Sequence, residues 1–380
     1  EKLDQIEKLS AERRADLIAE ATSSVEAQVI PGYEAMIALY ETLLENTDHD
    51  AGIWRIPDGD KIYQAALKSN TTTDMSAEEI HAIGLSEVTR ISTEMDEILR
   101  AQGYTEGTVT ERVKALMQSP DQIFPNTAEG RQQMLDYLVE LNDDVMSRAG
   151  DFFITLPDQP LEIVRVPEYS QNSAPGGYYS RPALDGSRPG RFYINLKDTR
   201  DNPRWTLPTF LYHEAAPGHH FQLSLSQKIK DVPIVRSMSL FSAYSEGWAL
   251  YAERMVKDDM DIYANHPLAD LGRLQSEMFR AVRLVVDTGM HAKKWSREES
   301  IDYMIANTGM TDDEVTREIE RYVVWPGQAT SYKTGQIAIL KMRKRAEDAL
   351  GDKFDLSEFH ELVLMNGAMP LGILGETVDD

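Results

Sequence analysis

Apolar residues recur three and four positions apart over most of this chain, which is the pattern of an amphipathic helix. One clear example covers residues 30–43, at Ile30, Tyr33, Met36, Ile37, Tyr40 and Leu43. The longest departure covers residues 156–202, where Pro and Gly punctuate short runs of β-branched and aromatic residues. The sequence therefore predicts a mostly α, multi-helix protein in which one small β-sheet is inserted before the later helices.

The sheet separates two helical parts of the chain. We assign residues 1–150 to an N-terminal helical region and residues 151–380 to a catalytic region, and expect one continuous domain. Ser76-Ala77-Glu78-Glu79 is a capping box that predicts the start of a helix. The predicted strands are residues 161–166 and 191–196, and the predicted later helices are residues 210–226, 241–256, 268–290, 297–307, 312–322 and 329–349.

The charge and composition of the chain exclude several kinds of partner. Its 380 residues include 39 Lys and Arg against 63 Asp and Glu, a net charge of −24, which disfavours nucleic acid and anionic membranes. No apolar run approaches the roughly 20 residues that a membrane-spanning helix needs. Cys is absent, which excludes disulfides, thiolate ligands and thiol nucleophiles. Any bound metal must therefore use His and carboxylate ligands.

The most unusual segment is His213-Glu214-Ala215-Ala216-Pro217-Gly218-His219-His220, which holds three of the eight His residues. A zinc hydrolase needs neutral imidazole ligands, a carboxylate that takes a proton from water, and a further ligand from another helix. The usual solution places two His four positions apart on one helix face. Here that position is Pro217, so the second ligand must be His219 or His220. A helix end with surface His residues is the alternative interpretation.

The geometry of a helix favours His219 over His220. On a regular helix His220 lies on nearly the same face as His213 but about 10.5 Å along the axis, while His219 is rotated by about 120° from that face. Pro217 cannot donate a backbone hydrogen bond and Gly218 accepts unusual dihedral angles. We therefore predict that the helix bulges here and brings His219 to the metal, with His220 as the alternative.

A third ligand is available on a later helix. Glu246 lies in the largely apolar segment Ser245-Glu246-Gly247-Trp248-Ala249-Leu250-Tyr251-Ala252-Glu253, where core packing favours an apolar residue. Taken alone, Glu246 is as well explained by a solvated or ion-paired position. Beside the His cluster, it is our candidate for the third metal ligand.

These two segments resemble the bacterial family catalogued as domain of unknown function 885, which is similar to the gluzincin metallopeptidases. The resemblance implies a zinc-dependent peptidase. Family members are often longer at the N-terminus and exported, so it also implies the C-terminal part of a periplasmic or lipoprotein-anchored protein. Further segments that resemble the family are residues 52–59, 71–74, 80–85, 191–196, 287–291 and 326–333.

Other residues fit a peptidase on physical grounds. We expect both His291 and Tyr332 to donate to the oxyanion of the reaction, with Asp287, four residues before His291, orienting its imidazole, although packing explains both residues too. An exposed strand at residues 191–196 would pair with an extended peptide, and a plain edge strand is the alternative. Arg283 and Lys333 are candidates for contact with a substrate carboxylate, with solvated positions as the alternative.

The leading hypothesis is a zinc metallopeptidase that acts on a peptide or small amide. His213, His219 and Glu246 bind Zn²⁺, Glu214 is the general base, and His291 and Tyr332 stabilise the oxyanion. A metal-dependent amidase or esterase with a non-peptide substrate would use the same groups. The presence of Pro217 and the high acidity also suit a non-catalytic binding protein with a degenerate metal site.

Overall fold

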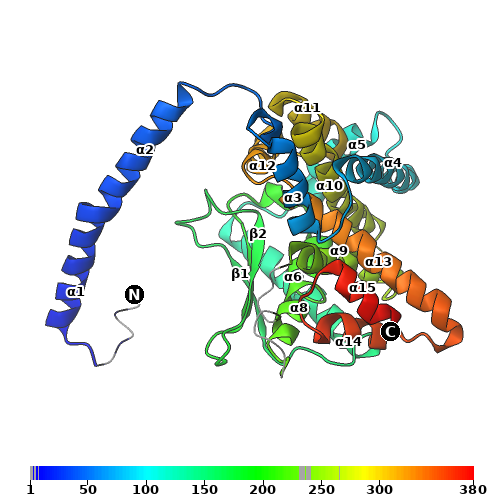
Figure 1. Cartoon of the computed structure of the whole chain (residues 1–380). Helices are drawn as coiled ribbons and strands as arrows, with labels where there is room; N and C mark the ends of the chain where they lie inside the picture. The colour runs from blue at the N-terminus through cyan, green and yellow to red at the C-terminus, as the bar shows by residue number, and fades with distance from the viewer. Residues whose placement is uncertain (1–2, 4–5, 7, 231–235, 237–240, 265) are drawn as a thin grey trace. The chain divides into compact units, whose positions relative to one another are not determined.

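The computed structural model describes residues 3, 6, 8–230, 236, 241–264 and 266–380 (Figure 1). The chain forms two compact units, Glu1–His49 and Asp50–Asp380. Positions 1–2, 4–5 and 7 of the first predicted helical stretch lie outside the described residues. The two units meet between His49 and Asp50, well before the predicted boundary at residue 150. Near residue 150 the chain changes from helices to the sheet.

The first unit is helical, as its apolar spacing predicts. It contains α1 (Ala11–Ser24), a π-helical segment (Val25–Val29) and α2 (Ile30–Leu44). Ser10 caps α1 by accepting a hydrogen bond from the Arg13 amide at 3.2 Å. No described side chain of this unit is buried.

The second unit is also mostly helical, and the predicted fold class is confirmed. Ser76 and Glu79 form the predicted capping box, with the Ser76 amide donating to the Glu79 carboxylate at 2.8 Å. The same motif begins three further helices, α5, α11 and α12. The helices are α3 (Gly59–Thr71), α4 (Ala77–Ala101), α5 (Val109–Met117), α6 (Ala128–Arg148), α7 (Leu207–Glu214), α8 (His219–Ser226), α9 (Ser242–Asp258), α10 (Pro267–Ala292), α11 (Arg297–Thr308), α12 (Asp312–Val324), α13 (Ser331–Leu350), α14 (Leu356–Met365) and α15 (Leu371–Asp379).

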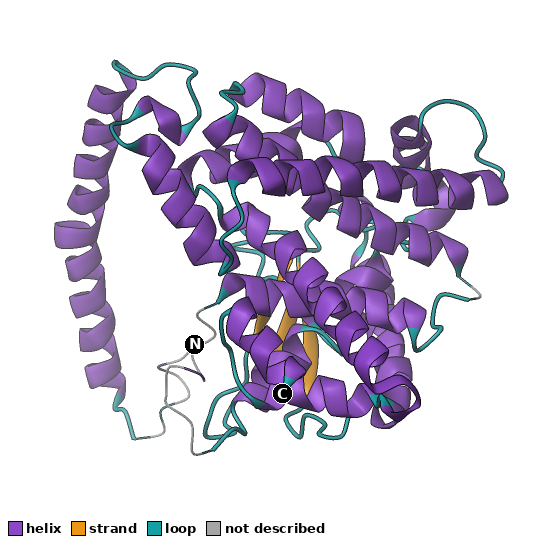
Figure 2. Ribbon diagram, turned by 45° about the vertical axis from the view of Figure 1, so that its right-hand side comes forward, coloured by secondary structure: helices purple, strands orange, loops and turns teal. Residues whose placement is uncertain are grey.

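The described residues contain one three-stranded sheet, which lies among the helices (Figure 2). Its strands are β1 (Leu161–Arg165), β2 (Gly177–Ser180) and β3 (Gly190–Ile194), in the order β1-β3-β2. β3 pairs in parallel with β1 and antiparallel with β2. The expectation of an exposed strand at residues 191–196 is therefore wrong, because β3 is the central strand and both its edges are already paired.

Two close helix pairs organise the core. α10 packs along α4, and α9 packs along α13. The second pair depends on Gly247 and Gly335, since a Cβ atom on Gly247 would lie only 2.6 Å from the backbone of Gly335. Glu246 precedes Gly247, and Tyr332 lies one turn before Gly335. The close approach of the two helices therefore brings these two functional candidates near each other.

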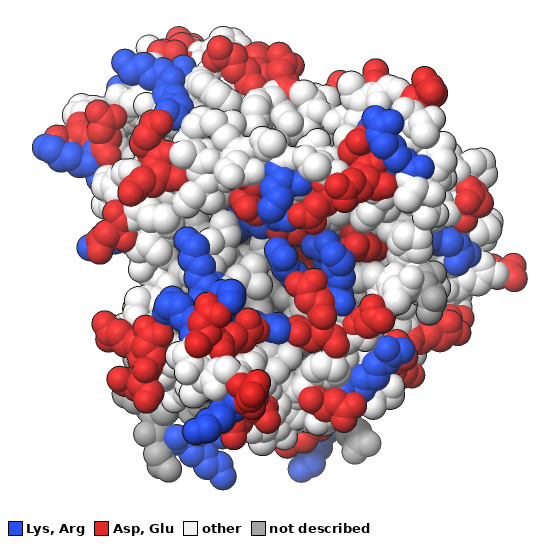
Figure 3. Space-filling view, turned by 90° about the vertical axis from the view of Figure 1, so that its right-hand side faces the viewer, with Lys and Arg blue, Asp and Glu red and all other residues white. Residues whose placement is uncertain are grey.

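The net negative charge is not concentrated on the face of the molecule in Figure 3, where acidic and basic side chains are interspersed. Within the described part of the chain, no helix combines the length and the apolar character that crossing a membrane requires.

Candidate metal centre

The His-rich segment forms two short helices. α7 ends at Glu214 and α8 begins at His219, with a cis peptide bond between Ala216 and Pro217. A side chain at Gly218 would lie 2.0 Å from the carbonyl oxygen of His213, so only glycine fits there. The predicted bulge within one continuous helix is therefore wrong. Because Pro217 supplies no amide hydrogen, the chain breaks the helix and starts a second one.

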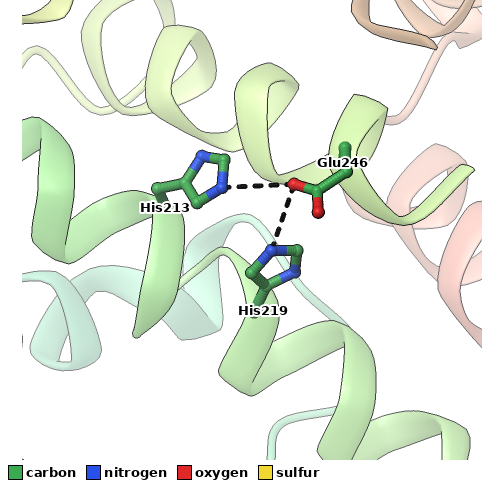
Figure 4. Close-up of side chains that lie close together, drawn as sticks. All are labelled: His213, His219 and Glu246. Carbon is green, nitrogen blue, oxygen red and sulfur yellow. Dashed lines mark ion pairs between the residues drawn. The ribbon is translucent and has the colours of Figure 1, made fainter. Parts of the chain in front are cut away.

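The break brings His213 and His219 together with Glu246 of α9. The Nε2 atoms of both His residues lie 3.4 Å from the same Oε2 atom of Glu246, as Figure 4 shows. Potential ligand atoms of all three residues lie within 4.8 Å of one another. The indole nitrogen of Trp248 donates to the Pro217 carbonyl at 3.0 Å, which ties the break between the helices to α9.

The two His–Glu separations match those between ligands of a zinc ion. Ligand atoms about 2.0–2.1 Å from a tetrahedral zinc ion lie about 3.3–3.4 Å apart, and both His–Glu distances are 3.4 Å. Burial acts to raise the pKa of Glu246, but hydrogen bonds from His213 and His219 outweigh it and hold this pKa well below its usual range. Burial acts to lower the pKa of His213, but hydrogen bonds to Glu246 and Glu253 outweigh it and raise this pKa to about 9, so a zinc ion would take the place of the proton on its Nε2 atom. With that exchange, two imidazoles and an ionised carboxylate fit a zinc ion.

Glu253 supports this cluster, a role that we did not assign to it from the sequence. Its Oε1 atom lies 2.7 Å from Nδ1 of His213, and its Oε2 atom accepts a hydrogen bond from Thr209 at 3.0 Å. A carboxylate at Nδ1 fixes the imidazole so that Nε2 faces the metal position. The signal was present, since Glu253 lies seven residues after Glu246 and therefore on the same face of an otherwise apolar helix.

His220 points away from the cluster and binds the sheet. Its Nδ1 atom lies 2.9 Å from the hydroxyl of Tyr179 on β2, and a side chain at Gly190 would lie 2.9 Å from the same atom. Burial lowers the pKa of His220 to about 4, so the ring is neutral near pH 7. His219 rather than His220 thus joins His213, which is the arrangement that we favoured.

Glu214 is buried, and its carboxylate group remains available for a reaction. It follows His213 at the end of α7, and within the described residues its carboxylate makes no hydrogen bond or ion pair. A carboxylate beside the first ligand with free oxygen atoms is able to accept a proton from water.

Tyr332 lies near the cluster on α13. Burial raises its pKa, and the negative charge of Glu246 raises it further, so the hydroxyl keeps its proton. The ring of Tyr332 also lies 4.5 Å from the guanidinium carbon of Arg283. A protonated phenol beside the metal ligands is a suitable donor to an oxyanion.

The contacts of His291 argue against the oxyanion role that we predicted. Its Nδ1 atom accepts a hydrogen bond from the Ile53 amide at 3.1 Å, and its Nε2 atom donates to the Tyr322 carbonyl at 3.0 Å. Asp287 does not orient this ring either, because it accepts hydrogen bonds from the Tyr63 hydroxyl and a backbone amide. Both nitrogen atoms of His291 hold backbone segments together, which is a packing role.

Lys333 is also unavailable to a substrate. It is almost fully buried, and its ammonium group pairs with Glu277 and, at 2.9 Å, with Glu87. Gln336 accepts a third hydrogen bond from it at 2.7 Å. All three protons of the ammonium group are therefore used, and the expected contact with a substrate carboxylate is wrong for this residue.

The family model described as "bacterial protein of unknown function (DUF885)" matches residues 1–378. The chain belongs to this family. The predicted family resemblance is thereby confirmed, whereas its link to the gluzincin peptidases remains a prediction. No curated protein matches the chain.

Two solved structures are similar to this DUF885 chain. The "putative lipoprotein" from Colwellia psychrerythraea is 44% identical, with a TM-score of 0.97 over 100% of this chain and 64% of that chain. The "putative lipoprotein of unknown function" from Shewanella oneidensis is 20% identical, with a TM-score of 0.76 over 99% of this chain and 68% of that one. The second likeness shows the fold alone. The DUF885 chain thus spans 64% of the length of the Colwellia protein.

A cavity of about 930 Å³ reaches the cluster from one side. His213 lines it together with Thr209 and Phe210 of α7 and with Phe279 and Arg280 of α10. Its volume lies within the range of about 300–1,000 Å³ typical of ligand pockets. The cavity therefore has room for a short peptide beside the candidate metal ligands.

Proposed function

We propose that this protein is a zinc-dependent hydrolase and that it cleaves peptide bonds. The observation that carries the proposal is the placement of two imidazole nitrogen atoms at 3.4 Å from one oxygen atom of Glu246. The free carboxylate of Glu214 and the adjoining cavity support it, because a hydrolase needs both a base and space for a substrate.

Each protein residue has a distinct task in this proposal. Zinc, when bound by His213, His219 and Glu246, supplies a Lewis acid that makes water nucleophilic near neutral pH. Glu214 accepts the proton of the attacking water and passes it to the leaving amine. Tyr332 donates a hydrogen bond to the oxygen atom that becomes negatively charged. His291 is left out, because both its ring nitrogen atoms are occupied.

We propose an exported, lipid-anchored location as well. Both similar solved structures are named as those of putative lipoproteins, and the Colwellia protein is longer than this chain.

The test of the proposed function is zinc-dependent cleavage of a mixture of short synthetic peptides, followed by mass spectrometry. The parent protein dialysed with zinc is expected to cleave at least one peptide, and removal of zinc with a chelator is expected to abolish this cleavage until zinc is restored. Cleavage that continues at the same rate in the chelated protein would overturn the metal-dependent mechanism. A zinc-loaded protein that cleaves no peptide would overturn the peptidase assignment.

A further inference from the structure

One face of α10 carries two arginines, of which Arg280 lines the cavity and Arg283 is buried one turn further along the helix. One side of this helix carries four residues at helical spacing, Ser276, Phe279, Arg280 and Arg283. Gly272, earlier on α10, lies against the backbone of Trp205 just before α7. Further along the two helices, Phe279 and Arg280 line the same cavity as His213. α10 therefore packs beside α7, and Arg280 lies at the cavity that His213 of the candidate metal centre also lines.

Arg280 has no acidic partner. Its Nη1 atom donates to the hydroxyl of Ser276 at 2.6 Å and to the carbonyl of the same residue at 3.3 Å. Its Nε atom is buried and makes no hydrogen bond. Within the described parts of the chain, no Asp or Glu forms an ion pair with this guanidinium group. Arg280 therefore presents a guanidinium group without an ion pair to the cavity, whose lining also includes Lys114, Arg200 and the carboxylates of Asp198, Asp201, Asp312 and Glu314.

Arg283 is 5% exposed and only partly satisfied. Its Nε atom donates to the Tyr322 hydroxyl at 2.7 Å, and its Nη2 atom donates to Glu318 at 3.0 Å. Its Nη1 atom is buried without a hydrogen-bond partner. Glu318 also pairs with Arg321 at 3.1 Å, so two guanidinium groups share one carboxylate. An unpaired buried donor on a charged group is costly unless a ligand completes it.

Aromatic rings connect these two arginines to the candidate catalytic residues. The guanidinium carbon atoms of Arg280 and Arg283 lie 5.3 and 4.1 Å from the ring of Phe279. On its other side, Arg283 lies 4.5 Å from the ring of Tyr332. A ligand bound to Arg280 would therefore lie in the cavity that Phe279 and His213 also line, with Arg283 and Tyr332 behind Phe279.

We propose that Arg280 and Arg283 bind the free C-terminal carboxylate of a short peptide, which makes the enzyme a carboxypeptidase that removes the terminal one or two residues. A guanidinium group is well suited to this task because its planar donors match the two oxygen atoms of a carboxylate. The inference rests on the proposed function. Hydrolysis consumes one water and releases a carboxylate and an amine, so no further reactant is needed.

The test compares three related probes, N-acetyl-Ala-Phe with a free carboxylate, its C-terminal amide, and N-acetyl-Ala-Glu amide. Their binding to the Glu214→Gln variant, dialysed with zinc, is measured by calorimetry, and their hydrolysis is measured with the parent protein. The free acid is expected to bind about 10²-fold more tightly than its amide, as is typical for a buried charge pair. The Glu-containing amide shows whether a side-chain carboxylate substitutes for the terminal one.

Arg280→Met and Arg283→Met, placed in the same background, are each expected to remove most of this preference. Arg283→Lys is a second variant that keeps the positive charge. Its melting temperature and its preference for the acid show whether a loss of preference in Arg283→Met comes from a folding defect. Arg343→Met is the matched control, because Arg343 also pairs with a carboxylate, Asp259, in a partly buried position, and neither residue lines the cavity. It is expected to leave the preference unchanged.

The outcomes separate this inference from the proposed function. If Glu214→Gln with both arginines intact binds the acid and the Phe amide equally, the carboxylate site is overturned, even if the parent protein cleaves both peptides. Equal binding of the Glu-containing amide and the free acid overturns the assignment to a terminal carboxylate. Preference for the acid without any hydrolysis supports the carboxylate site and overturns the peptidase. Retention of the preference in both Met variants overturns the role of these arginines.

Discussion

His219→Ala is expected to abolish stable zinc binding and peptide hydrolysis, whereas His220→Ala retains both. The physical reason is that His219 directs Nε2 at the Glu246 oxygen, while His220 bonds to Tyr179 on the sheet. Loss of a direct ligand should weaken zinc binding by more than the roughly 10–100-fold typical of changes in residues that support a ligand. Zinc content after dialysis, measured for both variants, checks the prediction.

The two substitutions control for each other, because they remove the same side chain from adjacent positions of α8. His220→Ala is expected to lower the melting temperature, since it deletes a buried contact between α8 and the sheet. If His220→Ala lost zinc and His219→Ala kept it, the assignment of the second ligand would be reversed.

Glu214→Gln is expected to reduce hydrolysis by roughly 10²–10⁴-fold, the usual effect of removing a general base. The amide keeps the size of the side chain but does not take a proton from water. Zinc content and melting temperature are expected to stay at the parent values, because Glu214 is outside the three-residue ligand set and holds no other described residue. The measurement is kcat/KM on any peptide that the parent protein cleaves.

Glu361→Gln is the matched control for Glu214→Gln. Glu361 is a half-buried carboxylate that accepts hydrogen bonds from Thr155, and it does not line the cavity. Its substitution is expected to change stability and leave kcat/KM per folded molecule unchanged. Equal kcat/KM values for Glu214→Gln and the parent protein would remove Glu214 from the mechanism.

Local patterns in the sequence predicted most of the helical fold. The helices α9 to α13 begin and end within two residues of the predicted positions, because apolar periodicity and capping residues act over a few neighbouring residues. The predicted helix 210–226 is instead the pair α7 and α8, and α14 and α15 were not predicted. β2 was not predicted, since its four residues, Gly177–Ser180, lie among turn-forming residues and carry little strand signal of their own. β3 is central only because it pairs with both β1 and β2, which lie elsewhere in the sequence. Its central position was therefore not predicted either.

The metal cluster was predictable from residue types, but its supporting contacts were not. The spacing of His213, His219 and Glu246 identified potential ligands, and Pro217 marked where a regular helix would fail. Whether the chain bulges or breaks there depends on packing against Trp248 of α9, which local pattern does not report. The contacts of His291 with Ile53 and the carbonyl of Tyr322 likewise join segments far apart in the sequence.

The most direct test of the central claim is anomalous X-ray scattering at the zinc absorption edge, measured from a crystal of the protein grown with zinc. We expect one strong anomalous peak about 2.0–2.2 Å from Nε2 of His213, Nε2 of His219 and a carboxylate oxygen of Glu246. Data collected just below the edge should lose this peak, which identifies the element. The absence of a peak at these three residues, with zinc bound elsewhere or not at all, would contradict the proposed metal centre.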